Sequence, residues 1–217
     1  KKQQETITLY PGAEQFPVKK GEVIGYSGNS GSSVAPHLHF EIRDSKTEEP
    51  INPLLFGFDI KDDIPPSIFG VKLYSFEGAS ISGNNKDKVY TASKIAGSYT
   101  LNSGKPIPVN GKLGLAINTI DKLNIANNKC GVYSIDLYID NELVFQHKLE
   151  KLSFYTNRYI NAHMDYLQYR YGKKSFHKSF LSENNKLKIY GEVKENGIIS
   201  ISDNKLHKVK YVVKDVY

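Results

Sequence analysis

The alternation of apolar and polar residues in short runs is the strongest constraint on the fold. The clearest run is GVYSIDLYIDNELVFQHKL, residues 131–149, in which Ile135, Leu137 and Ile139 share one face of an extended chain. A turn-forming pair, Asp140-Asn141, divides the run into two halves. The run therefore predicts a β-hairpin.

Comparable runs recur through the second part of the chain, separated by Asn, Gly and Asp. They cover residues 69–76, 112–121, 186–192, 197–203 and 207–215. Spaced short strands of this kind predict an antiparallel β-sandwich.

Residues 156–172, TNRYINAHMDYLQYRYG, are the exception to this pattern. Apolar and aromatic side chains recur there at spacings of three and four, as on one face of an amphipathic helix. That face would carry Tyr159, Ile160, His163, Met164, Leu167 and Tyr171. We predict one helix inserted in the sandwich, with His163 as a packing residue on its face.

A stretch rich in proline, residues 50–70, indicates a boundary between two folded parts. It holds four of the nine prolines together with several aspartates. We place the boundary near Asp62, which gives domains at residues 1–61 and 62–217. Residues 16–44 read as strand, turn, strand, Gly/Ser loop and strand, so the whole chain is predicted to be mainly β.

The net charge of +6 is unevenly distributed over these two parts. Residues 1–61 hold 7 Lys or Arg against 8 Asp or Glu, and the remainder holds 22 against 15. This surplus suits an anionic partner, but it spreads over many loops and forms no dense basic run of the kind typical of nucleic-acid binding. No stretch approaches the roughly 20 apolar residues that span a bilayer.

Two histidines one residue apart in PHLHFEIRD, residues 36–44, form the candidate catalytic feature. If residues 37–43 are a strand, alternate side chains share a face. One face would carry His37, His39, Glu41 and Arg43, and the other would send Leu38, Phe40 and Ile42 into the core. Neighbours on one face are about 6.5–7 Å apart, so one imidazole would bind a metal and the other would act as an acid or base.

This run and its flanks resemble the lysostaphin or LytM-type zinc endopeptidases, which cut peptide cross-links in bacterial peptidoglycan. The resemblance covers about residues 16–57, with VKKGEVIGYSGNSG before the histidines and PINPLLFG after them. In that family the second histidine of the pair binds zinc and the first assists the attacking water or the tetrahedral intermediate. The resemblance therefore implies His39 as a ligand of Zn²⁺ and His37 as the catalytic residue.

The sequence departs from that family in the other zinc ligands. The family takes a further His and an Asp from a segment well before the pair, whereas here no histidine precedes His37 and the first acidic residue is Glu5. The chain opens on KKQQETITLYPG without an initiator Met. We therefore expect an excerpt of a longer enzyme, with an incomplete zinc site and no activity alone.

The remaining histidines lie beyond the predicted boundary. They are His147, His163, His177 and His207. A substitute metal site built on HMD, residues 163–165, is disfavoured.

The second domain, residues 62–217, resembles the immunoglobulin-like modules appended to secreted bacterial enzymes. Within it, residues 166–178, YLQYRYGKKSFHK, interleave aromatic and basic side chains. Two interpretations stay open for this segment: a half-buried helix with a basic rim, or a surface that stacks on glycans or binds anionic envelope polymers.

Together these features predict a partial LytM-type β-sheet domain followed by an immunoglobulin-like β-sandwich with a helical insertion. The intact protein would be secreted or periplasmic in a bacterium and would hydrolyse peptidoglycan peptides, with no nucleic-acid partner and no transmembrane segment. An alternative function is a non-catalytic LytM-like protein that binds peptidoglycan or activates another cell-wall hydrolase.

Overall fold

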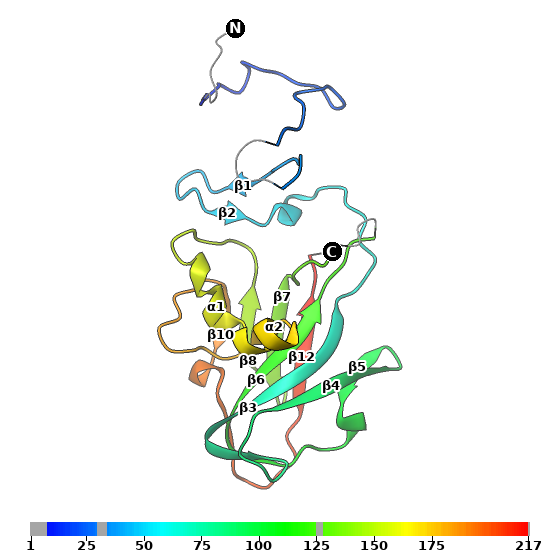
Figure 1. Cartoon of the computed structure of the whole chain (residues 1–217), viewed down its shortest axis with the longest axis vertical. Helices are drawn as coiled ribbons and strands as arrows, with labels where there is room; N and C mark the ends of the chain where they lie inside the picture. The colour runs from blue at the N-terminus through cyan, green and yellow to red at the C-terminus, as the bar shows by residue number, and fades with distance from the viewer. Residues whose placement is uncertain (1–7, 30–33, 125–127, 217) are drawn as a thin grey trace. The chain divides into compact units, whose positions relative to one another are not determined.

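The computed structural model describes residues 8–29, 34–124 and 128–216 (Figure 1). The chain forms two compact units, Lys1–Phe40 and Glu41–Tyr217. The two compact units separate between Phe40 and Glu41, earlier in the sequence than the domain boundary predicted near Asp62. The division into domains at residues 1–61 and 62–217 remains a prediction.

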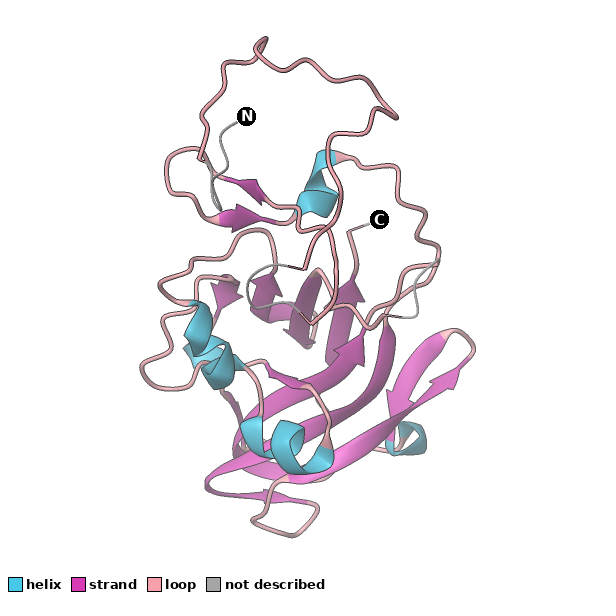
Figure 2. Cartoon of the chain, turned by 45° about the horizontal axis from the view of Figure 1, so that its top comes forward, coloured by secondary structure: helices cyan, strands magenta, loops and turns pink. Residues whose placement is uncertain are grey.

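Two antiparallel sheets make up most of the second unit (Figures 1 and 2). The larger sheet has the strand order β11 (Ile199–Ile201), β6 (Val109–Ile120), β3 (Ser67–Ile81), β4 (Lys88–Ile95) and β5 (Ser98–Leu101), and β9 (Phe176–Lys178) also pairs with β6. The smaller sheet has the order β10 (Tyr190–Val193), β8 (Glu142–Lys148), β7 (Ser134–Ile139) and β12 (Val209–Lys214). The prediction of a mainly β fold is confirmed.

The remaining elements are short. They are the strands β1 (Ile42–Arg43) and β2 (Pro50–Ile51), the 3-10 turns η1 (Pro53–Phe56), η2 (Asn102–Gly104), η3 (Asn157–Tyr159) and η4 (Glu195–Gly197), and the helices α1 (Ile160–His163) and α2 (Tyr166–Gly172).

One apolar core lies between the two sheets, because both sheets contribute alternate side chains to it. Its buried members include Val71, Leu73, Leu115 and Ile117 from the larger sheet and Ile135, Leu137 and Phe145 from the smaller one. The hairpin of β7 and β8 turns at Asp140 and Asn141, whose φ angles of 50° and 72° match the predicted tight turn. The more specific likeness to immunoglobulin modules remains a prediction.

The single helix predicted over residues 156–172 is wrong. The chain instead forms η3, α1 and α2, and the helical path breaks at Met164, where ψ is 149°. Met164 forms an isolated antiparallel bridge with His177, and the carboxylate of Asp165 accepts a hydrogen bond from the Gln168 amide to start α2. Leu167, predicted to be on the packed face, is 63% exposed as a result.

The hairpin formed by β1 and β2 belongs to the second compact unit and is bonded to the rest of it. The Asn52 amide donates to the Glu150 carbonyl at 2.7 Å. Lys151 pairs with the carboxylates of Asp44 at 3.2 Å and Glu49 at 2.9 Å. These contacts explain why the unit begins at residue 41, before the proline-rich stretch.

The strands predicted for the first part of the chain are largely not formed. Within residues 8–29 and 34–41 the described backbone is turn and coil, and only Ile42–Arg43 of the predicted strand 37–43 pairs as a strand. Apolar side chains there are exposed, including Val23 at 71%, Ile24 at 82% and Leu38 at 87%. The sequence does alternate apolar and polar residues here. Alternation alone does not form a strand, because a strand also needs a neighbouring strand to pair with and a core to pack against.

Candidate functional site

His37 and His39 both lie on exposed backbone of the first unit. Nδ1 of His37 lies 3.0 Å from the carbonyl oxygen of Ala35. A carbonyl oxygen only accepts, so Nδ1 carries the proton of this bond and the neutral ring keeps its lone pair on Nε2. An imidazole in that state can accept a proton or bind a metal through Nε2.

The predicted common face of His37, His39, Glu41 and Arg43 is not formed as a strand face. Glu41 accepts a hydrogen bond from Nε of Arg43 at 2.6 Å, and both belong to the second unit. In the described part of the first unit, no three side chains of His, Cys, Asp or Glu come close enough to hold one ion. The donor set there does not amount to the three protein ligands of a zinc hydrolase.

Three histidines that the sequence left apart come together in the second unit. His147, His163 and His177 each place one ring nitrogen within 4.8 Å of the others. His163 is buried, at 1% exposure, as a packing residue would be. Its proximity to two other histidines was not predicted. No short motif connects the three residues, because they come from β8, α1 and β9.

Three aspartates form a second cluster in the same unit. Carboxylate oxygens of Asp62, Asp121 and Asp215 lie within 4.8 Å of one another. Asp121 is 6% exposed and its Oδ1 has no hydrogen-bond partner among the described residues. Burial raises the pKa of Asp121, and the negative charges of Asp62 and Asp215 raise it further. This cluster is a point of charge repulsion in the fold.

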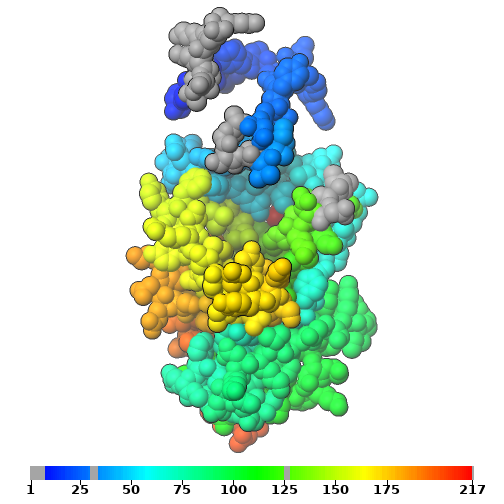
Figure 3. Space-filling model, viewed as in Figure 1, coloured from blue at the N-terminus to red at the C-terminus, as the bar shows by residue number. Residues whose placement is uncertain are grey.

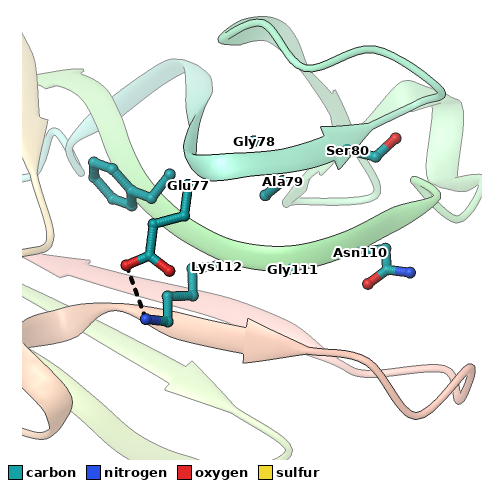
Figure 4. Close-up of a pocket in the computed structure, with 8 residues that line it drawn as sticks. Glu77, Gly78, Ala79, Ser80, Asn110, Gly111 and Lys112 are labelled. Carbon is teal, nitrogen blue, oxygen red and sulfur yellow. Dashed lines mark hydrogen bonds and ion pairs between the residues drawn. The ribbon is translucent and has the colours of Figure 1, made fainter.

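A pocket lies where the pairing of β3 and β6 is interrupted by a register shift (Figure 4). Its lining is Phe76, Glu77, Gly78, Ala79, Ser80, Asn110, Gly111 and Lys112. Its charged groups are Glu77 and Lys112, which pair at 2.9 Å with both side chains about half exposed or more. None of the predicted site residues lines this pocket, and we assign no chemistry to it.

Helix α2 carries exposed aromatic side chains. Tyr166, Tyr169 and Tyr171 are 57%, 60% and 81% exposed, and Arg170 lies between them in the sequence. In Figure 3 the residues of α2 lie at the surface of the molecule. Of the two interpretations of this segment, the exposure of these tyrosines favours the stacking surface, and both remain predictions.

None of the helices in the described ranges is both long and apolar enough to cross a bilayer.

Comparison with known families gives one finding for the first part of the chain. Residues 4–53 match the family model described as Peptidase family M23. The matched stretch contains both His37 and His39 and ends at Pro53, inside the second compact unit. It supports a LytM-type peptidase domain fragment in this part of the chain. No curated protein and no solved structure matches the chain significantly.

Proposed function

We propose that residues 4–53 are part of a zinc-dependent endopeptidase that hydrolyses the peptide cross-links of bacterial peptidoglycan. The observation that carries this proposal is the peptidase family match over the stretch that contains His37 and His39. In this function His39 is a zinc ligand and His37 is the catalytic residue.

The surroundings of His37 suit a residue that handles a proton. Its Nδ1 is bonded to the Ala35 carbonyl, which leaves Nε2 as the basic nitrogen. The residue as a whole is exposed. Bound zinc would supply polarisation of the scissile carbonyl and acidification of water.

The described part of the first unit does not supply the full ligand set for such a reaction. Among the described residues of the first unit, no group of three His, Cys, Asp or Glu side chains lies close enough to hold one ion. We propose that this chain alone neither retains catalytic zinc at His39 nor cleaves peptidoglycan. The place of action would be the bacterial cell envelope, where the proposed substrate is found.

A second candidate function is non-catalytic binding of peptidoglycan or activation of another cell-wall hydrolase. The exposed tyrosines and Arg170 of α2 favour it, because aromatic rings stack on sugars and cations attract anionic envelope polymers. The surplus of basic residues in 62–217 also favours this second function, because it attracts anionic polymers.

Zinc content and hydrolysis, measured on this chain and on the complete gene product, separate the two functions. The enzyme proposal expects the complete gene product to bind zinc through His39 and to release peptides from purified peptidoglycan, and this chain to do neither. If the folded complete product shows neither property but sediments with insoluble peptidoglycan, the non-catalytic function replaces the enzyme. Loss of that sedimentation in Tyr166→Ala/Tyr169→Ala would place binding on α2.

A further inference from the structure

Three buried or partly buried imidazoles meet where three separate elements converge. His147 lies on β8 of the smaller sheet, His177 on β9 beside the larger sheet, and His163 at the end of α1. His147 and His163 are each 1% exposed. These residues belong to a single compact unit, so their relative placement is part of its fold.

One nitrogen–nitrogen distance in this cluster matches that between two ligands of one metal ion. Nε2 of His163 lies 3.2 Å from Nδ1 of His177, and the ring centroids of His147 and His163 are 4.7 Å apart. Zinc binds imidazole nitrogen at about 2.0–2.1 Å, so two nitrogens on one tetrahedral ion are roughly 3.3 Å apart. The third ring, that of His147, also places a nitrogen within 4.8 Å of the other two.

Hydrogen bonds around His163 fit a metal-binding tautomer. Nδ1 of His163 lies 3.3 Å from the hydroxyl oxygen of Tyr190, and that oxygen accepts a bond from Nδ2 of Asn185 at 2.7 Å. When Nδ1 of His163 donates to Tyr190, the lone pair of Nε2 faces His177. Metal-binding histidines usually fix their orientation through such a bond from the second ring nitrogen.

His147 completes the cluster as a third, almost fully buried ring. It meets the His163 ring edge-on with centroids 4.7 Å apart, and its centroid lies 5.9 Å from that of His177.

We propose that His147, His163 and His177 bind one divalent transition-metal ion, with zinc as the expected occupant, and that this ion cross-links the two sheets and the helical insertion. Three imidazoles select zinc, nickel or copper over calcium or magnesium, which prefer oxygen ligands. The burial of the rings points to a stabilising ion and not to a site that a large substrate enters. This site is separate from His37 and His39 and does not depend on the proposed peptidase function.

The test uses the whole chain with His37→Ala and His39→Ala, so that neither of those residues can contribute a ligand. Metal-depleted protein is dialysed against Zn²⁺, and zinc is measured by mass spectrometry beside the melting temperature. We expect one zinc per chain and a melting temperature raised by roughly 5–10 °C at zinc concentrations well above the Kd. A folded chain that binds no zinc and shows no rise would overturn the proposal.

Single variants assign the site to these residues. His163→Gln and His177→Gln should each lose the zinc and the rise in melting temperature, whereas His207→Gln, at a surface histidine paired with Asp140 and Asp203, should keep both. Zinc retained by folded His163→Gln and His177→Gln would also overturn the proposal. If these variants fail to fold, Co²⁺ bound to the parent chain decides, because a tetrahedral nitrogen site gives visible absorption bands and their absence would contradict the site.

Discussion

Nζ of Lys72 lies 2.7 Å from Oδ2 of Asp165 in the interior of the second unit, although the two residues are 93 positions apart. The hydroxyl of Tyr74 donates to the same oxygen at 2.5 Å, and Oδ1 of Asp165 accepts from the Gln168 amide at 3.1 Å. Lys72 and Asp165 are 7% and 5% exposed. One carboxylate thus joins strand β3 to the start of helix α2.

Replacing Asp165 should therefore be among the most destabilising changes to this unit. Asp165→Ala would leave the ammonium of Lys72 buried with only Asp87, at 3.3 Å, to balance it. Removing one partner of a buried ion pair typically destabilises a protein by about 3–5 kcal/mol. Urea denaturation followed by circular dichroism measures the change.

The matched control for this substitution is Glu77→Ala. Glu77 also forms an ion pair, with Lys112 (Figure 4), but both of these side chains are about half exposed or more. Its loss should change the free energy of unfolding by less than about 1 kcal/mol. Similar effects of the two substitutions would contradict the role given to Asp165.

The Lys72–Asp165 pair also shows which features the sequence could predict. The β7–β8 hairpin was correctly predicted because its pairing, turn and alternation all lie within residues 134–148. The break before Asp165 was not predicted, because the helical spacing of apolar residues continues across this position without interruption. The break coincides with the bridge from Met164 to His177 and with the contact of Asp165 with Lys72, both of which join residues far apart in the sequence.

The same distinction applies to the candidate sites. His37 and His39 stood out because a single strand-length motif contains both. His147, His163 and His177 did not, because each is an isolated histidine and only the packing of β8, α1 and β9 brings them together. The sequence does contain part of the information: His147 is two residues after Phe145, so on a strand both side chains point to the same, buried face.

His207 should make stability depend on pH. Its Nε2 lies 2.9 Å from Asp203 and its Nδ1 2.6 Å from Asp140, and these hydrogen bonds raise the pKa of His207. A histidine with a raised folded-state pKa stabilises the fold fully below its unfolded pKa of about 6.5, and this contribution is lost as the pH rises through the folded value. The unfolding free energy of the wild type should therefore exceed that of His207→Gln, and the difference should be larger at about pH 5.5 than at about pH 9. An equal difference at both pH values would contradict the raised pKa.

Asp121→Asn should stabilise the protein at neutral pH. The buried, unpaired Oδ1 of Asp121 lies among the carboxylates of Asp62 and Asp215, so removing one negative charge relieves repulsion. Because the folded-state pKa of Asp121 is raised, the advantage of Asn should grow as the pH rises above about 4 and vanish below it. Urea midpoints across this range measure it.

Asp63→Asn is the control for Asp121→Asn, since the Asp63 carboxylate pairs with Lys61 at 3.4 Å and should gain nothing. A lower midpoint for Asp121→Asn would instead show that the fold needs the negative charge, as it would if a cation neutralised the cluster.

The roles proposed for His37 and His39 can be separated in the complete gene product. His37→Ala should reduce peptidoglycan hydrolysis by at least about 100-fold while the zinc at the peptidase site is retained, since His37 handles protons and does not bind the ion. His39→Ala should lose both that zinc and the activity. Metal analysis beside peptide release distinguishes these results, and hydrolysis retained by either variant would exclude that residue from catalysis.

Gly197→Ala should be strongly destabilising because an added Cβ would collide with the neighbouring backbone. The same substitution at Gly83 separates this effect from backbone strain. A Cβ at Gly197 would lie 2.3 Å from the Ser179 carbonyl oxygen and 2.7 Å from Cα of Phe180, and φ there is 75°. Gly83 has nearly the same φ, 77°, but a Cβ at that position meets nothing within 4 Å. Both substitutions share the strain of a left-handed alanine, about 1 kcal/mol, and only Gly197→Ala adds overpacking, about 1–3 kcal/mol more.

The backbone opposite Gly197 has little room to move away. The Ser179 amide donates to the Leu115 carbonyl of β6 at 2.8 Å, and the Leu181 amide donates to the Asn196 carbonyl at 2.8 Å. The segment is therefore held on both sides, two residues after His177. Urea denaturation of the two glycine variants should show a clear difference in unfolding free energy. Equal values would mean that the segment after β9 yields, and that His177 is held less firmly than the contacts of its neighbours indicate.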